Sequence, residues 1–120
     1  MALRPPAVAV TPEGGQAISA SGDGTLKVWD LKAGKEVRTL EGHSGPVTAV
    51  AVTLEGGQAI SVSSDLTLKV WDLDSGRCQA TFTADAPLSA CAVAKDGVTI
   101  VAGDESGTVH FLTLEMAAAR

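Results

Sequence analysis

His43, Ser61 and Asp65 are the side chains of this sequence whose types, taken together, could do chemistry. A histidine that accepts the proton of a serine hydroxyl, oriented by an aspartate, forms a nucleophilic triad, and triads are recognised by geometry rather than by order along the chain. An active site also needs an exposed nucleophile, an oxyanion hole and a pocket, and none of these is visible in the sequence. We therefore expect no catalytic residues and no enzyme.

Three other features could bind a phosphate, a cation or a second sulfur. The turn GDGT at 22–25 is too short for a phosphate-binding loop, and no Gly-Lys-Ser/Thr follows it. Acidic residues recur in the turns, where solvated turns and caps are the expected role; they are Glu13, Asp23, Glu55, Asp96 and Asp104. Cys78 and Cys91 have no Cys-x-x-Cys pairing and no histidine at ligand spacing, so we expect small buried thiols, with a disulfide as the alternative. No metal site and no cofactor are predicted.

The composition excludes several classes of partner. The net charge is −5 and no basic run is present, which argues against a nucleic-acid surface. No apolar run approaches the ~20 residues of a membrane helix, and no long apolar stretch follows MALRPP as a signal peptide would require. We expect a cytoplasmic protein with neither a nucleic-acid nor a membrane partner. The aromatic content is 3%, so the core must be built from Val, Ile, Leu and Ala.

The chain repeats one unit three times. The segment TPEGGQAISASGDGTLKVWDL from Thr11 returns from Thr53 as TLEGGQAISVSSDLTLKVWDL, and Trp29 and Trp71 lie 42 residues apart. A more divergent copy, LSACAVAKDGVTIVAGDESGTVHFLTL, begins at Leu88 with a spacing of 41. Self-similarity at roughly 40 to 45 residues is the period of a four-stranded propeller blade.

Each copy divides into short apolar runs separated by turn residues. Runs joined by short turns pair with their sequence neighbours as an antiparallel meander. The predicted strands are 7–11, 16–21, 26–31 and 35–40 in the first copy, 47–53, 58–63, 66–73 and 77–83 in the second, and 88–94, 98–103 and 108–114 in the third. The third copy then ends in EMAAAR, so we predict no fourth strand there.

Residues 7–115 resemble WD repeats, the blades of β-propellers, and the twin KVWDL motifs carry the resemblance. The predicted fold is all-β, with three consecutive four-stranded antiparallel blades of which the third lacks its outer strand, forming a partial or self-assembling β-propeller. The predicted organisation is an irregular lead-in at 1–6, blade 1 at 7–41, blade 2 at 42–83, a degenerate blade 3 at 84–115 and a tail at 116–120. The near-identity of the first two copies also resembles bacterial multidomain signalling proteins in which WD repeats follow an NTPase module.

The resemblance implies a structural network of His, Ser, Asp and Trp side chains within each blade. In the second copy these are His43, Ser61, Asp65 and Trp71, and in the first copy they are Ser19, Asp23 and Trp29, with the histidine position falling at Met1. The third copy has Ala84, Ala102, Ser106 and Leu112 at the four positions, so aliphatic packing is expected to hold it. His110 aligns with Lys69 and is not expected to replace the missing histidine.

The resemblance also implies a partner-binding upper face, formed by positions near the start of each first strand and before each turn aspartate. They are Arg4, Pro6, Gly22, Pro46, Thr48, Ser64, Pro87, Ser89 and Glu105. Most are small and uncharged, whereas interface hot spots favour Trp, Tyr and Arg. The expected function is a noncatalytic scaffold for protein–protein interaction, as part of a larger propeller or sensor module.

Three blades in a row leave two apolar faces uncovered, since a propeller protects its faces by closing a ring. The alternative function is therefore a self-assembling structural repeat, in which identical chains close a ring of six or nine blades. The interface would then join Val8 and Val10 to Val101 and Val109, head to tail. An enzyme with a pocket at the channel mouth and a transcribed gene remnant are the remaining alternatives.

Overall fold

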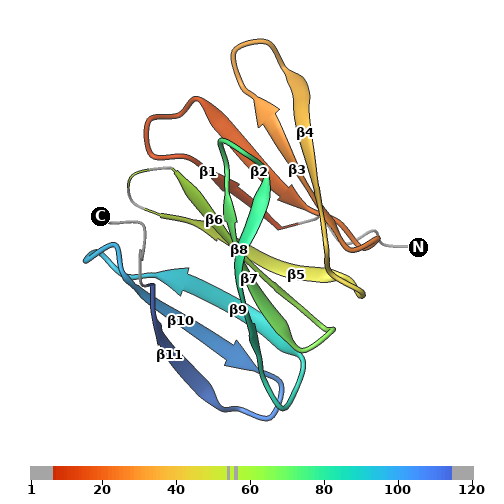
Figure 1. Ribbon diagram of the computed structural model, residues 1–120, viewed down its shortest axis with the longest axis vertical. Coiled ribbons are helices and arrows are strands. Elements are labelled where there is room, and N and C mark those ends of the chain that lie inside the picture. The colour runs from red at the N-terminus through yellow and green to blue at the C-terminus, as the bar shows by residue number, and fades with distance from the viewer. Residues whose placement is uncertain (1–6, 54, 56, 115–120) are drawn as a thin grey trace.

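The chain folds into three antiparallel β-sheets that follow one another in sequence. The computed structural model describes residues 7–53, 55 and 57–114, and every regular element among them is a β-strand. The sheets hold four, four and three strands in the orders β1-β2-β3-β4, β5-β6-β7-β8 and β9-β10-β11. Figure 1 shows them in succession, from the red and orange blade through the yellow and green blade to the blue one. The predicted all-β class and the three-stranded third blade are confirmed.

The strand bounds lie close to the predicted runs. Blade 1 contains β1 (Val8–Val10), β2 (Gln16–Ala20), β3 (Thr25–Asp30) and β4 (Lys35–Glu41). Blade 2 contains β5 (Val47–Val52), β6 (Gln58–Ser63), β7 (Thr67–Asp72) and β8 (Arg77–Thr83). Blade 3 contains β9 (Leu88–Val93), β10 (Thr99–Asp104) and β11 (Val109–Thr113).

Turn side chains fix where strands three and four of a blade meet. In blade 1 the carboxylate of Asp30 accepts hydrogen bonds from the backbone amides of Lys32 (2.9 Å) and Ala33 (3.3 Å). Gly34 then adopts a φ of +68°, a left-handed conformation that glycine takes without steric cost. This turn lets β3 and β4 pair in register from Asp30↔Lys35 outward.

Side chains alternate between two lateral faces of each blade. We call the face that carries Trp29, Trp71 or Leu112 the front face, and the face that carries Ile18, Ile60 or Val101 the back face. The front face of blade 2 packs on the back face of blade 1, and the front face of blade 3 packs on the back face of blade 2. The core therefore lies in two separate junctions between blades rather than in one central cluster.

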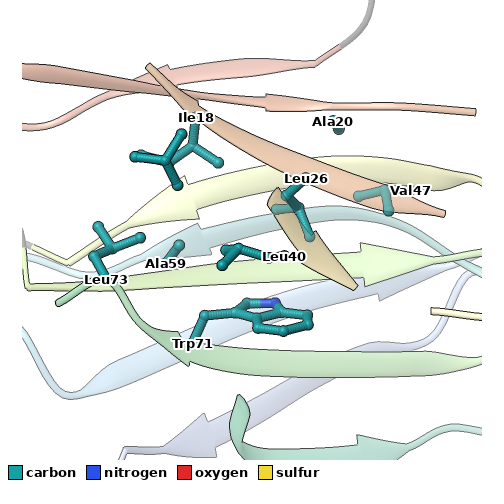
Figure 2. Close-up of a cluster of buried hydrophobic side chains, with 9 residues drawn as sticks. Ile18, Ala20, Leu26, Leu40, Val47, Ala59, Trp71 and Leu73 are labelled. Carbon is teal, nitrogen blue, oxygen red and sulfur yellow. The ribbon is translucent and has the colours of Figure 1, made fainter. Parts of the chain in front are cut away.

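The first junction is the more aromatic of the two. Figure 2 shows the Trp71 indole beneath Leu26 and Leu40 of blade 1, with Ala59 and Leu73 of its own blade beside it. The buried members of the second junction are all aliphatic, and Phe82 packs against them; they are Ile60, Val62, Leu68, Val70, Ala84, Leu88, Ile100 and Ala102. Burial of these side chains supplies most of the stabilisation that holds the blades together.

A few hydrogen bonds also cross the junctions. The Val47 amide of blade 2 donates to the Ser21 carbonyl of blade 1 at 3.1 Å. The Arg38 guanidinium donates to the carbonyls of Asp74 and Ser75 at 3.0 and 3.1 Å. These polar contacts fix the position of neighbouring blades relative to each other, which non-directional apolar packing does not do alone.

No helix in the described part of the chain is long and apolar enough to cross a membrane.

Candidate functional site

Blade 2 brings His43, Ser61, Asp65 and Trp71 together in one hydrogen-bonded chain. His43, in the loop before β5, places its Nδ1 atom 3.1 Å from Asp65 Oδ2 and its Nε2 atom 2.6 Å from Ser61 Oγ. The Trp71 indole Nε1–H donates to the same Ser61 oxygen at 2.8 Å. Ser61 and Trp71 lie on the neighbouring strands β6 and β7, whose register pairs Ser61 with Lys69.

One histidine tautomer satisfies every member of this network. With the proton on Nδ1, His43 donates to Asp65, and its Nε2 atom accepts the Ser61 hydroxyl proton, which leaves the Ser61 oxygen to accept from the indole. Thr67 completes the arrangement, because its Oγ1 lies 3.1 Å from His43 Nδ1 and donates to Asp65 Oδ1 at 2.5 Å. Among the described residues no buried side-chain nitrogen or oxygen lacks a hydrogen-bond partner.

Burial and hydrogen bonding hold both ionisable members in one protonation state. Burial lowers the pKa of His43 below its ordinary value of 6.5, although the Asp65 carboxylate opposes this shift. Burial alone would raise the pKa of Asp65, but hydrogen bonds from Thr67, the Ser44 amide and His43 lower it well below 3.8. At neutral pH the pair is therefore a neutral imidazole beside an ionised carboxylate.

The contacts among His43, Ser61 and Asp65 match the connectivity of a nucleophilic triad. However, Ser61 has no exposed surface, and its oxygen is already occupied by the Trp71 indole. A substrate carbonyl therefore has no path to this hydroxyl. What the arrangement does is link the loop before β5 to the middle strands of blade 2.

Blade 1 contains only part of the same network. Trp29 Nε1 donates to Ser19 Oγ at 3.0 Å, as in blade 2. Asp23 accepts from the Thr25 amide and hydroxyl at 3.0 and 2.6 Å, as Asp65 does from Thr67, so it caps its own turn. The predicted histidine position, Met1, lies outside the described residues.

Blade 3 contains a polar network that the prediction of aliphatic packing missed. Asp104 is buried, and its Oδ2 lies 2.9 Å from Nε2 of His110 on β11. Its Oδ1 accepts from the Ser106 hydroxyl and amide at 2.6 and 2.9 Å and from the Thr108 amide at 3.1 Å. The ring of His110 also packs edge-on against Phe82 of blade 2, with ring centroids 5.5 Å apart.

The carboxylate has moved two residues along the turn compared with the other blades. Blades 1 and 2 have Ser-x-Asp at this turn, with Asp23 and Asp65, whereas blade 3 has Asp-x-Ser at 104–106. Hydrogen bonds from Ser106 and His110 lower the pKa of Asp104 to about 2. His110 does not occupy the site of the missing histidine, but it does provide blade 3 with a histidine–aspartate pair. The sequence does contain a signal for this pair, because Asp104 and Ser106 keep the two-residue spacing of Ser63 and Asp65 in the reverse order.

A groove of about 250 Å³ opens between blades 2 and 3. Its apolar lining includes Leu68, Val70, Phe82, Ile100, Leu112 and Leu114. At the 41-residue spacing Leu112 corresponds to Trp71, and the equivalent space in the first junction holds the Trp71 indole. The leucine side chain fills less of this space than an indole does, and the groove lies beside β11, the edge strand of the three-stranded sheet.

The predicted upper-face positions lie in pairs along one rim of the blades. The Ser64 amide donates to the Pro46 carbonyl at 3.2 Å, and the Glu105 amide donates to the Pro87 carbonyl at 2.9 Å. Thr48 is different, because its hydroxyl donates to the Leu88 carbonyl of blade 3 at 2.7 Å and so takes part in a blade junction.

Exposure divides the predicted upper-face set. Pro46, Ser89 and Glu105 are exposed, as is Gly22, whereas Ser64 and Pro87 are half-buried. Arg4 and Pro6 lie outside the described residues.

The prediction of buried thiols is wrong for Cys78 and holds in part for Cys91. Cys78 is exposed because it lies on the outer strand β8, and Cys91 is half-buried at the second junction. Both thiols are free, so the alternative of a disulfide is not realised. Burial raises the pKa of the Cys91 thiol to about 12.

Three of the turn acids, Asp23, Asp96 and Asp104, accept hydrogen bonds from backbone amides of their own turns. Asp96, for example, accepts from the Val98 and Thr99 amides, each at 2.9 Å. Among the described residues no group of three or more His, Cys, Asp or Glu side chains could hold a metal ion.

Comparison with known families agrees with the blade geometry. The family described as TEP-1 C-terminal beta-propeller matches residues 43–114, and the WD domain, G-beta repeat, matches residues 6–30. The chain belongs to the WD-repeat β-propeller family. Its blade 2 contains the complete His-Ser-Asp-Trp network that the resemblance implied, and its blade 3 lies within the longer matched range.

Curated relatives of this WD-repeat chain match it over short segments. The Angio-associated migratory cell protein of Homo sapiens is 45% identical over 42 residues, which is 32% of this chain and 10% of that protein. The Mitochondrial division protein 1 of Malassezia globosa is 53% identical over 30 residues, which is 25% of this chain and 4% of that protein. That of Eremothecium gossypii is 59% identical over 27 residues, which is 22% of this chain and 4% of that protein. The matches thus cover a tenth or less of these relatives.

Proposed function

We propose that this WD-repeat chain is a noncatalytic scaffold for protein–protein interaction that works as part of a larger propeller. The observation that carries the proposal is the rim where Pro46, Ser89 and Glu105 are exposed. Backbone hydrogen bonds to Pro46 and Pro87 hold this rim to the adjoining turns, so its side chains are displayed on a rigid support. A preorganised surface loses little conformational freedom on binding, which favours affinity.

The absence of access to Ser61 supports the noncatalytic part of the proposal. Its hydroxyl is buried and bonded to both His43 and Trp71, so the residues that most resemble a catalytic set stabilise the blade instead. Two free thiols, one of them exposed on β8, support a reducing and therefore cytoplasmic location. A sensor role within a bacterial multidomain signalling protein stays a prediction from the sequence.

The rim can be tested by changing its charge and bulk without touching the core. The variant Ser89→Arg with Glu105→Arg alters two exposed side chains, and Lys95→Glu changes an exposed residue in the turn at the opposite rim as a matched control. Cross-linking in cell extract followed by mass spectrometry should then lose specific partners with the double variant and keep them with the control. An identical set of cross-linked proteins for wild type and double variant would overturn binding through this rim.

A further inference from the structure

The large hydrophobic side chains that remain exposed gather on the two outermost blade faces. Seven such side chains are exposed among the described residues, and five of them lie on these faces. Val8 (58% exposed), Val10 (49%) and Leu31 (45%) lie on the front face of blade 1, where Trp29 is half-buried. Val109 (53%) and Phe111 (73%) lie on the back face of blade 3. Apolar patches of this kind usually mark an interaction site.

Each outermost face is a copy of a face that is already covered within the chain. At the 42-residue spacing Val8, Val10, Trp29 and Leu31 correspond to Val50, Val52, Trp71 and Leu73, which all pack against blade 1. At the 41-residue spacing Val109 and Phe111 correspond to Leu68 and Val70, which pack against blade 3. The exposed front face of blade 1 therefore resembles faces that pack on a back face. The exposed back face of blade 3 resembles faces on which a front face packs.

From this complementarity we propose that the back face of blade 3 docks the front face of blade 1 of a second copy of this chain. The contact continues the pattern of the two existing junctions, with Phe111 and Val109 of one copy against Val8, Val10 and Trp29 of the other. Val101, which the sequence also placed at this interface, is half-buried and contributes less. The inference goes beyond the proposed scaffold function, because the association needs no partner protein.

Two copies complete the arrangement better than three. A head-to-tail contact forms a ring when the rotation between copies closes. The three described blades of two copies make six blades, within the usual range of four to eight, whereas those of three copies make nine. A closed dimer covers all four outermost faces, while an open pair leaves two of them exposed to water.

The surroundings of two equivalent turn glycines differ between blade 1 and blade 3. Gly24, in the turn between β2 and β3, approaches the loop before β5 so closely that a Cβ there would lie 2.7 Å from the His43 carbonyl oxygen. Gly107 holds the corresponding position in blade 3 with nothing within 4 Å of its Cβ position. A following loop occupies this space at the first junction, and the described residues leave it open beside Gly107.

The first test is the mass of the purified chain by light scattering across a dilution series. We expect a discrete species of twice 12.1 kDa that dissociates on dilution. Phe111→Asp should weaken this association by more than about a hundredfold, since it places an unpaired carboxylate in an apolar interface. Val98→Asp is the matched control, because Val98 is also exposed in blade 3 but lines a pocket on the side of blade 2. Circular dichroism of each variant shows whether the blades remain folded.

Mixing two variants distinguishes this contact from a symmetric one. Val8→Asp damages only the front face and Phe111→Asp only the back face, so each variant alone should be monomeric. Together they retain one intact pair of faces and should form a heterodimer with blue-shifted Trp29 emission. A wild-type monomer at all concentrations, or variants that fail to complement on mixing, would overturn the docking. A trimer or an open series of larger species would overturn closure by two copies.

Discussion

The two junctions between blades are filled by different side chains. At the first, the Trp71 indole fills the space between blades 1 and 2 and donates to Ser61, which connects through His43 to Asp65. At the second, Leu112 lies beside a groove. The histidine–aspartate pair there is His110 with Asp104 of blade 3, and the His110 ring contacts Phe82 across the junction. A blade can therefore lose all four residues of the repeat network and keep its place, provided that its front face stays aliphatic.

The largest expected difference between the two junctions is at Trp71 and its counterpart Leu112. Trp71→Ala should reduce the free energy of unfolding by about 3–5 kcal/mol, because it removes a fully buried aromatic side chain and leaves a cavity. Leu112→Ala, at the corresponding position, should cost less than half as much, since Leu112 is half-buried beside an existing groove. Urea unfolding of both variants measures the difference. Equal losses would mean that the two junctions depend equally on this position.

The buried serine gives the next largest effect. Ser61→Ala should cost about 1–3 kcal/mol, because it leaves both His43 Nε2 and the Trp71 indole without partners in a buried site. Ser19→Ala in blade 1 removes one hydrogen bond, from Trp29, at a half-buried position and should cost less. Urea unfolding of the two serine variants tests the ranking, and a larger loss for Ser19→Ala would contradict it.

The second junction can be rebuilt to resemble the first. Leu112→Trp should fill the groove, and Ala102→Ser should place a hydroxyl at the position of Ser61. The free energy of unfolding of the double variant should exceed the value expected from adding the two single changes by about 1 kcal/mol, the value of one hydrogen bond. A double-mutant cycle by urea unfolding measures this coupling. A coupling of zero would show that the indole does not reach the serine in blade 3.

The smallest expected effect is a pH dependence that separates the titration of His43 from that of the carboxylates Asp65 and Asp104. The pKa of His43 is below 6.5 in the folded chain, so its contribution to stability is present above pH 6.5 and is lost as the pH falls below that value. The slope is at most about 1.4 kcal/mol per pH unit. Asp65 and Asp104 have pKa values below 3.8, so their contribution persists to lower pH and is lost as the pH falls past 3.8.

Replacing the histidine separates these two windows. His43→Gln should remove the part of the stability loss near pH 6.5 that comes from His43, and leave the loss below pH 3.8 in place. Thermal unfolding at a series of pH values checks this. A wild-type stability that stays flat from pH 6.5 down to the onset of carboxylate protonation would contradict the depressed pKa of His43.

Repetition made most of the fold readable from the sequence. The two KVWDL motifs fixed a spacing of 42, and the resemblance to WD repeats implied that His43, Ser61, Asp65 and Trp71 form one network within a blade. The absence of a fourth run after 108–114 predicted the three-stranded sheet. These features depend on strand order and period, which a local pattern of apolar and turn residues records directly.

The contacts that sequence reasoning missed are those that depend on how faces meet. The 41-residue spacing places Ser106 opposite Asp65, so the sequence did not point to Asp104. The acidic and hydroxyl residues have exchanged places in the turn, which changes both residue types but keeps the hydrogen bonds between them. Thr48 was assigned to a partner face, but its hydroxyl reaches the Leu88 carbonyl of the next blade. The exposure of Cys78 follows from its place on the outermost strand, where no following element covers the sheet.

The confinement of strand pairing to single blades has a consequence for how the chain opens. Every backbone ladder among the described strands closes within one sheet, and neighbouring sheets share only side-chain packing and isolated hydrogen bonds. Stability then propagates from unit to nearest neighbour, so the end units fray before the middle one. In a monomeric variant, amide hydrogens of β9, β10 and β11 should exchange with solvent through openings that leave β6 and β7 protected, which makes blade 2 the last part of the chain to lose its protection.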